Sequence, residues 1–193
     1  MALALGADGV ELDVRRARRG ALVVHHDLVL DGHPVRGLSR PPLPSLAVAL
    51  NASAGALVNI ELKTDGDAPE GAARTLCSYL RRRNGRDRVL ASSFDPVALR
   101  TLRALRPDIP TALVVEHDDE LAAALEEAVA AGHEAVHPQW RLVDRVLIKR
   151  ARGLGLAVRP WTVNDADEVQ RLAKLGVDGL ITDVPDVAIG ALA

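Results

Sequence analysis

The sequence predicts an α/β fold in which parallel strands alternate with helices. Short runs rich in β-branched residues alternate with amphipathic segments along most of the chain. From residue 57 onward the strand candidates begin about 22–32 residues apart, an interval that suits a strand followed by a helical crossover. A doubly wound open sheet would normally carry a Gly-rich phosphate loop after its first strand, and this sequence has none. We therefore predict a TIM (β/α)8-type barrel.

Eight segments have the length and composition of strands: residues 8–14, 21–25, 57–62, 88–92, 111–115, 134–137, 156–160 and 178–182. We interpret the first two as a hairpin that contributes one member to the barrel, which makes about seven barrel strands. A TIM barrel needs eight strands and typically has about 250 residues. The 193 residues of this chain therefore suit most of such a barrel.

Segments of helical period fill most of the intervals: residues 68–83, 96–106, 118–131 and 165–175. In the first of them, Leu76 and Leu80 share one face. Asp95 followed by Pro96 is a typical N-cap and first-turn pair. The charged run at 81–86 predicts a helix end and a turn. Glycines stand where helices should end: Gly132, Gly153, Gly155 and Gly176.

Composition excludes several classes of protein. A formal net charge of −2 does not favour nucleic acid or an anionic membrane as a partner. The single cysteine, Cys77, excludes an internal disulfide framework. No apolar run approaches the roughly 20 residues that cross a bilayer, and the N-terminus lacks the basic region of a signal peptide. We therefore expect one domain over residues 1–193, without membrane insertion, in the cytoplasm.

Ionisable side chains share one face on two strand candidates. Residues two apart on a strand point the same way, which groups Glu11 with Asp13. The same rule groups Asn59, Glu61 and Lys63 on the later strand. The opposite, apolar faces can pack on the helical shell, so the ionisable faces must point into the barrel. Carboxylates there are costly unless they are paired or bind a metal.

Three inward carboxylates and one lysine suit a hard divalent cation together with a bound phosphate. Oxygen-only ligands favour Mg²⁺ or Ca²⁺ over zinc. The alternative is that Glu11, Asp13 and Glu61 are ordinary strand-end charges in salt bridges. The second strand favours the metal site, because two such faces converge if both strands line one barrel.

Two other places could carry chemistry. His26 precedes Asp27 at a strand end, where an imidazole can act as general acid or base near neutral pH. The alternative is an ordinary turn capped by Asp27. Trp161 follows a strand and could form an apolar wall of a ligand pocket or fill the core beneath a loop. Of the other histidines, only His137, before Pro138, is expected near a barrel mouth.

Taken in order, these segments resemble the glycerophosphodiester phosphodiesterase family. The matching pieces are GADGVELDV, the hairpin ending VVHHD, NIELK, SSF, WTVN and GVDGLITDVP. No single motif is decisive, but their order and spacing are specific and cover nearly the whole chain. The resemblance implies a TIM-barrel phosphoric diester hydrolase that converts glycerophosphodiesters to glycerol 3-phosphate and an alcohol, with a divalent cation.

The resemblance also implies roles for individual residues. The implied metal ligands are Glu11, Asp13 and Glu61. His26 corresponds to one of two catalytic histidines, and His25 would replace it only if the register were misread. Lys63 corresponds to a lysine that contacts the phosphate, and Trp161 to a wall of the substrate pocket. The implied mechanism begins with attack of the substrate's own glycerol hydroxyl on phosphorus, after which water opens a cyclic phosphate.

The chain departs from the family pattern at its start. The family opens with a strand ending in His-Arg-Gly, followed by Glu-Asn at the first helix, and Met1 falls where that helix should finish. The other catalytic histidine, a phosphate-binding arginine and the glutamate of Glu-Asn have no counterpart. We therefore expect a barrel lacking its first strand and most of its first helix, whose unpaired strand edges would make self-association into homo-oligomers unsurprising.

Three hypotheses follow from this departure. The first is a phosphodiesterase whose working form begins upstream of Met1. The second is a non-catalytic barrel remnant that binds a cation or phosphoester, since losing one of two proton-transfer groups costs about 10²–10⁴-fold in rate. The third is a related phospholipase D-like barrel that acts on lysolipids or sphingolipids. The head-group preference has no readable signature in the sequence.

Overall fold

A computed structural model describes residues 1–83, 85 and 87–193, so Asn84 and Arg86 of the predicted helix end and turn lie outside the described residues. The fold is α/β with a mostly parallel sheet, as predicted, whereas closure of the barrel stays a prediction. Two compact units make up the chain, residues 9–110 and residues 1–8 with 111–193. The single domain over 1–193 also stays a prediction. In the described part of the chain, no helix is long and apolar enough to span a membrane.

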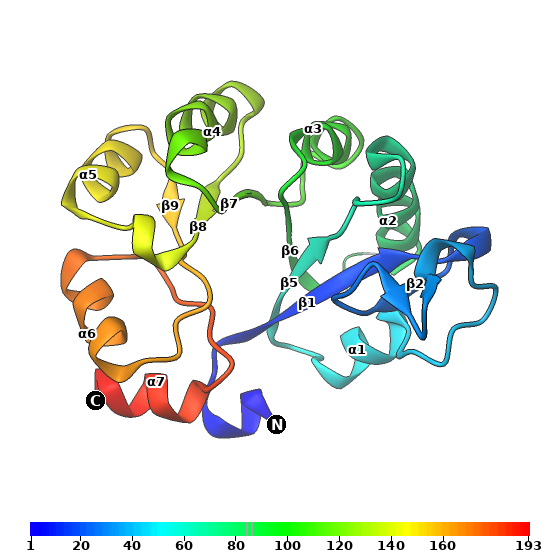
Figure 1. The fold of residues 1–193 in the computed structure, drawn as a ribbon, viewed down its shortest axis with the longest axis horizontal. Coiled ribbons are helices and arrows are strands. Elements are labelled where there is room, and N and C mark those ends of the chain that lie inside the picture. Colours follow the sequence, from blue (N-terminus) through cyan, green and yellow to red (C-terminus); the bar gives the residue numbers. More distant parts are fainter. Residues whose placement is uncertain (84, 86) are drawn as a thin grey trace. The chain divides into compact units, whose positions relative to one another are not determined.

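The sheet of the unit 9–110 has the strand order β2-β1-β5-β6 (Figure 1). Its strands are β1 (Gly9–Arg16), β2 (Leu22–Val24), β5 (Leu57–Leu62) and β6 (Arg88–Ser93). β1 and β2 are antiparallel with Val14 opposite Val24, which confirms the predicted hairpin. β1 pairs in parallel with β5, and Asp13 lies opposite Glu61. β5 in turn pairs in parallel with β6.

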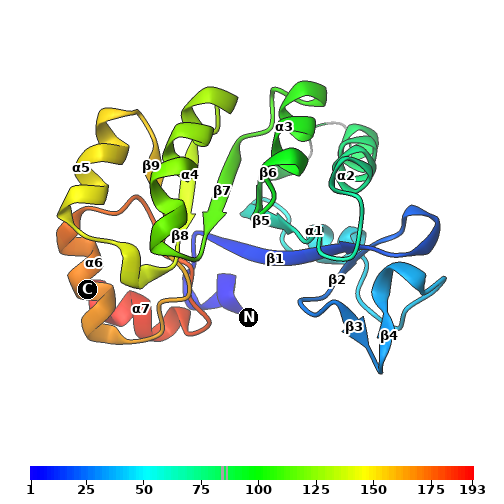
Figure 2. The same cartoon turned by 45° about the horizontal axis from the view of Figure 1, so that its top comes forward.

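Three helices accompany this sheet: α1 (Leu46–Ala52), α2 (Pro69–Arg83) and α3 (Pro96–Leu105). Figure 2 shows α2 and α3 next to each other. The apolar alternation of β5 buries Ile60 and Leu62 against the α2 side chains Leu76 and Leu80, as the periodicity predicts. The Asp95 carboxylate caps α3, also as predicted. Shorter elements complete the unit: η2 (Arg18–Gly20), β3 (Val29–Leu30), β4 (His33–Pro34) and η3 (Val35–Gly37).

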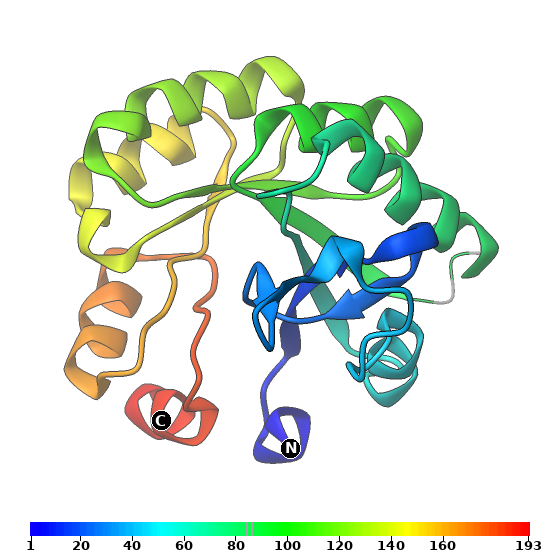
Figure 3. The ribbon, with the colours of Figure 1, turned by 45° about the vertical axis from the view of Figure 1, so that its right-hand side comes forward.

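The other unit is built on the parallel strands β7 (Thr111–Val115), β8 (Ala135–Pro138) and β9 (Ala157–Val158). Its helical elements are η1 (Ala2–Leu5), α4 (Asp118–Ala131), η4 (Trp140–Leu142), α5 (Arg145–Gly153), α6 (Ala166–Leu175) and α7 (Pro185–Leu192). Val136 and Val158 pack against buried side chains of the helices, such as Leu125 and Leu172. Figure 3 shows the N-terminal turn η1 near α7.

The strand predicted at 178–182 is wrong. This segment is held by separate hydrogen bonds: the Asp178 N–H donates to the Val158 carbonyl and the Ile181 N–H to the Pro160 carbonyl, both at 2.9 Å. Pro160 has no N–H to donate in return. The Val158 N–H is taken by the Asp178 carboxylate at 2.8 Å. Pro160 and the Asp178 carboxylate thus interrupt the backbone hydrogen bonds that a strand at 178–182 would need. The strand predicted at 156–160 shortens to β9 for the same reason.

Candidate functional site

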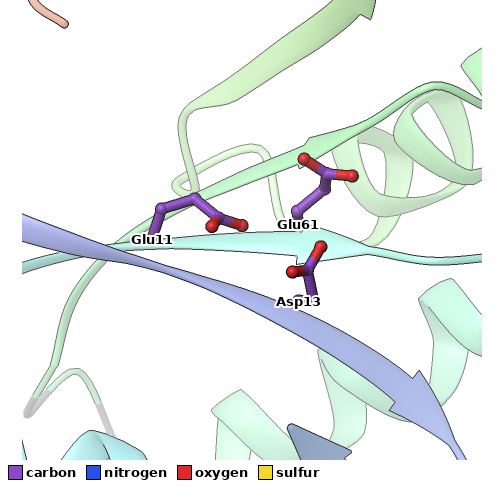
Figure 4. A group of neighbouring side chains, drawn as sticks. All are labelled: Glu11, Asp13 and Glu61. Carbon is purple, nitrogen blue, oxygen red and sulfur yellow. The ribbon is translucent and has the colours of Figure 1, made fainter. Parts of the chain in front are cut away.

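Glu11, Asp13 and Glu61 come together on two adjacent strands (Figure 4). One carboxylate oxygen of each lies within 4.8 Å of those of the other two. The period-two alternation of β1 puts Glu11 and Asp13 on one face, and the parallel register sets Asp13 beside Glu61. We call these three residues the acidic cluster. Its members are the three metal ligands expected from the sequence, and all three are half-buried.

Burial makes the negative charge of the acidic cluster costly. The removal of the Glu61 carboxyl from water raises its pKa above the ordinary value, and the positive charge of Lys63 counters only part of this effect. His26 also lies close enough to Glu61 for its charge to lower the Glu61 pKa. A bound divalent cation would offset the cost of this buried negative charge.

Lys63 contacts two members of the acidic cluster. Its Nζ lies 3.0 Å from Asp13 Oδ1 and also donates to Glu61 Oε1. The same Nζ lies 5.5 Å from the centre of the Phe94 ring. Burial disfavours the ammonium, but the Glu61 and Asp13 carboxylates hold the pKa of Lys63 above its ordinary value. Three carboxylates against one ammonium leave an excess of negative charge, which suits a divalent cation.

Asn59 and Ser92 add neutral polar groups beside the acidic cluster. Asn59 lies opposite Glu11 in the register of β1 and β5, and Ser92 lies opposite Glu61 in that of β5 and β6. Among the residues that the structure describes, the Asn59 amide and the Ser92 hydroxyl are buried without a hydrogen-bond partner. Buried polar atoms normally have one. Their place beside three carboxylates fits a cation that brings its own water molecules, as Mg²⁺ does.

His26 lies on the loop after β2, and its side chain is 72% exposed. Its Nδ1 lies 2.8 Å from Asp27 Oδ1. A carboxylate accepts only, so we assign the hydrogen to Nδ1, which leaves Nε2 able to accept a proton. This hydrogen bond lowers the pKa of Asp27. His25 instead directs Nε2 at the Val29 carbonyl, 3.1 Å away, so its ring is engaged with the backbone.

Trp161 belongs to the unit that contains residues 111–193. Its Nε1 donates to the His137 carbonyl at 2.7 Å and its backbone N–H to the Pro138 carbonyl at 3.1 Å. His137 itself is only 2% exposed, and burial, with the nearby charge of Arg159, lowers its pKa to about 3. His137 is therefore neutral and buried. The place of Trp161 relative to the acidic cluster stays a prediction.

Comparisons with known proteins find a family model, sequences and solved structures that are similar to this chain. The chain matches the model of the glycerophosphoryl diester phosphodiesterase family over residues 1–40 and 38–187. A glycerophosphodiester phosphodiesterase of Caldanaerobacter subterraneus subsp. tengcongensis is 28% identical over 214 residues, which cover 97% of this chain and 87% of that protein.

Solved structures share the fold. A phosphodiesterase of Oleispira antarctica, solved with the product sn-glycerol-3-phosphate, has a TM-score of 0.89 at 24% identity and covers 99% of this chain and 88% of its own. A glycerophosphodiester phosphodiesterase of Parabacteroides distasonis has a TM-score of 0.86 at 22% identity, with coverage of 98% and 85%. Because the family model matches residues 1–187 of this chain in two overlapping segments, the chain belongs to the glycerophosphoryl diester phosphodiesterase family.

Proposed function

We propose that this protein hydrolyses glycerophosphodiesters to glycerol 3-phosphate and an alcohol, as a phosphoric diester hydrolase that uses a divalent cation. The observation that carries the proposal is the acidic cluster, set on β1 and β5 of a chain that belongs to this family. Relatives named glycerophosphodiester phosphodiesterase support the reaction. The Oleispira antarctica structure, which holds sn-glycerol-3-phosphate as product, supports a small-molecule substrate of this class.

In this proposal Glu11, Asp13 and Glu61 hold the cation. The all-oxygen donor set suits Mg²⁺ or Ca²⁺. Once bound, a divalent cation polarises a phosphoryl oxygen and spreads the negative charge of the transition state. Lys63 supplies a further positive charge beside the cluster: Asp13 and Glu61 engage two of its three N–H donors, and we assign the third to a phosphate oxygen.

His26 is the proton-transfer group of the proposed mechanism. Asp27 holds the Nδ1 hydrogen, so Nε2 is the atom that accepts or returns a proton. The glycerol hydroxyl of the substrate attacks phosphorus and loses its proton, the P–O bond to the leaving alcohol breaks, and that alcohol takes up a proton. Water then opens the cyclic phosphate to glycerol 3-phosphate. We place Trp161 at the wall of the substrate pocket.

An assay of the purified protein with glycerophosphocholine tests the proposal. The expected result is release of glycerol 3-phosphate and choline in the presence of Mg²⁺ or Ca²⁺ and none after chelation. A parallel panel with lysophosphatidylcholine and sphingomyelin tests the phospholipase D-like alternative. Cleavage of the lysolipid or sphingolipid in preference to glycerophosphocholine would contradict the proposed substrate class. Cation binding without turnover of any of these compounds would favour the non-catalytic remnant.

The expectation that the working enzyme begins upstream of Met1 stays a prediction, as does its cytoplasmic location. The gene sequence upstream of Met1 tests the former, because the expectation requires an in-frame strand that ends in His-Arg-Gly.

A further inference from the structure

Arg15 extends the face of β1 that carries the acidic cluster. It lies two residues beyond Asp13, so its side chain leaves the strand on the same side. That side chain is only 7% exposed. A guanidinium is rarely buried to this extent unless its donors have fixed partners.

The partners of Arg15 lie on two different loops. Nε and Nη2 donate to the backbone carbonyl of His26 at 3.0 and 2.6 Å. Nη1 and Nη2 donate to the two carboxylate oxygens of Asp65 at 2.9 and 3.1 Å. Asp65 follows Lys63 by two residues on the loop after β5. One side chain of β1 thus joins the loop of the proposed proton-transfer group to the loop of the proposed phosphate contact.

The contacts of Arg15 direct most of its donors at other parts of the protein. A guanidinium has five N–H donors, and the contacts with His26 and Asp65 use four of them. The paired contacts hold the plane of the group in one orientation. Arg15 therefore acts mainly on other residues of the protein, by joining the two loops.

The loop that carries His26 needs such an anchor. The ring of His26 is largely exposed, and it contacts Asp27, which belongs to the same loop and cannot attach it to the sheet. The backbone supplies one attachment, since the His25 N–H donates to the Asp13 carbonyl at 2.9 Å. Arg15 supplies the next one along the chain, at the residue that bears the imidazole.

We propose that Arg15 is a positioning residue, which holds the backbone of His26 so that its imidazole is presented to the acidic cluster. This inference rests on the proposed function, in which His26 transfers protons. Lysine at position 15 would keep the charge but could not make the forked contacts. The conservative variant Arg15→Lys therefore tests orientation rather than charge.

The neighbouring residue provides a matched control. Arg16 lies on the same strand and also makes a forked ion pair with the loop after β5: its Nε lies 2.7 Å from Asp67 Oδ2, and its Nη2 donates to Asp67 Oδ1. The contacts of Arg16 are with Asp67 and not with His26. Arg16→Lys consequently makes the same chemical change one residue away, on the opposite face of β1.

Steady-state kinetics of the full chain with glycerophosphocholine measure the effect. We expect Arg15→Lys to lower kcat by about 10–10²-fold, the scale of loss when a catalytic group is displaced by about 1 Å, with KM and cation affinity unchanged. Arg16→Lys should match the wild type. In a His26→Gln background, Arg15→Lys should cause no further loss, because the group that it positions is gone. Equal kcat values for the two lysine variants, or a full additional loss in that background, would overturn the inference.

Amide hydrogen exchange provides a readout that does not need activity. Arg15→Lys should accelerate exchange at residues 25–27, and Arg16→Lys should not. Asp65→Asn, which weakens the ion pair at a half-exposed carboxylate, should produce a smaller change of the same kind and replaces Arg15→Lys if that variant does not fold. A wild type that turns over no glycerophosphodiester would contradict the proposed function. Unchanged exchange at residues 25–27 in Arg15→Lys and in Asp65→Asn would overturn the role of Arg15, whether or not the wild type is active.

Discussion

In the proposed metal site, each carboxylate of the acidic cluster is a ligand whose loss should weaken cation binding. Glu61→Gln keeps the size of the side chain and removes one negative ligand, so Mg²⁺ or Ca²⁺ affinity should fall steeply. Even the loss of an outer-shell partner of a metal site costs about 10–100-fold in affinity, so we expect at least about 10²-fold from the loss of a ligand. Isothermal titration calorimetry measures the affinity of each variant for Mg²⁺ or Ca²⁺. Glu120→Gln, an exposed carboxylate outside the cluster, is the control, and equal affinities in the two variants would exclude Glu61 as a ligand.

His137 makes stability depend on pH. The folded protein keeps its imidazole neutral down to about pH 3, whereas the ordinary pKa is 6.5. The unfolded chain therefore binds more protons between these values, and stability falls as the pH falls through this window. His137→Leu removes the titrating group, and within the described part of the chain the His137 side chain has no hydrogen bond to lose. We expect a Tm that declines less between pH 6.5 and pH 4.5 than in the wild type, while an exposed control, His117→Leu, follows the wild type.

At the scale of elements, α3 is attached to the site through its N-cap. The Asp95 carboxylate accepts from the Val97 and Ala98 N–H groups and from the Thr64 hydroxyl. Asp95→Ala should cost about 1 kcal/mol of unfolding free energy, within the usual range for a lost cap. Asp95→Asn should keep most of the stability that the cap provides, because the amide oxygen still accepts these hydrogen bonds. Urea unfolding measures both variants, and equal losses would show that the cap geometry is not what stabilises α3.

The elements also show what the sequence could predict. In β5, the alternation of Val58, Ile60 and Leu62 with polar residues predicts both the strand and the face that carries the acidic cluster, because burial of one face needs no distant information. The segment at 178–182 has a similar composition but forms no strand. The adjacent segment of the same chain contains Pro160, which has no N–H to donate to it. The two-residue strands of the β3–β4 hairpin are too short for any periodicity to appear.

The residues of the candidate site that the sequence does not predict depend on partners far away in the chain. Arg15 has an ordinary place after Asp13 in the sequence, and its role emerges only because Asp65, 50 residues away, and the His26 carbonyl meet its guanidinium. The sequence distinguishes Ser92 only as part of the SSF motif, and the register of β5 and β6 is what sets it beside Glu61. Periodicity predicts which face a side chain takes, whereas the partner on that face depends on how strands and loops are assembled.

At the scale of the whole molecule, the acidic cluster and the residues proposed to work with it lie within the unit 9–110: Glu11, Asp13, Arg15, His26, Glu61 and Lys63. Trp161 alone among the predicted site residues comes from the other unit. The cation and the phosphate contacts that we propose therefore depend on the packing of β1 against β5. The loss of these contacts should lower the stability of the ligand-bound protein as well as the rate of hydrolysis.

Ligand binding should therefore raise the melting temperature in two separable steps. A ligand at 100 times its Kd stabilises the folded state by about 2.7 kcal/mol, which corresponds to a rise of roughly 5–10 °C for a chain of this size. We expect Mg²⁺ or Ca²⁺ to raise the Tm, and sn-glycerol 3-phosphate to raise it further only when the cation is present. Lys63→Met should keep the first increase and lose the second, while Glu61→Gln should lose both. Differential scanning fluorimetry measures these shifts, and an increase with sn-glycerol 3-phosphate that survives chelation would place phosphate binding outside the acidic cluster.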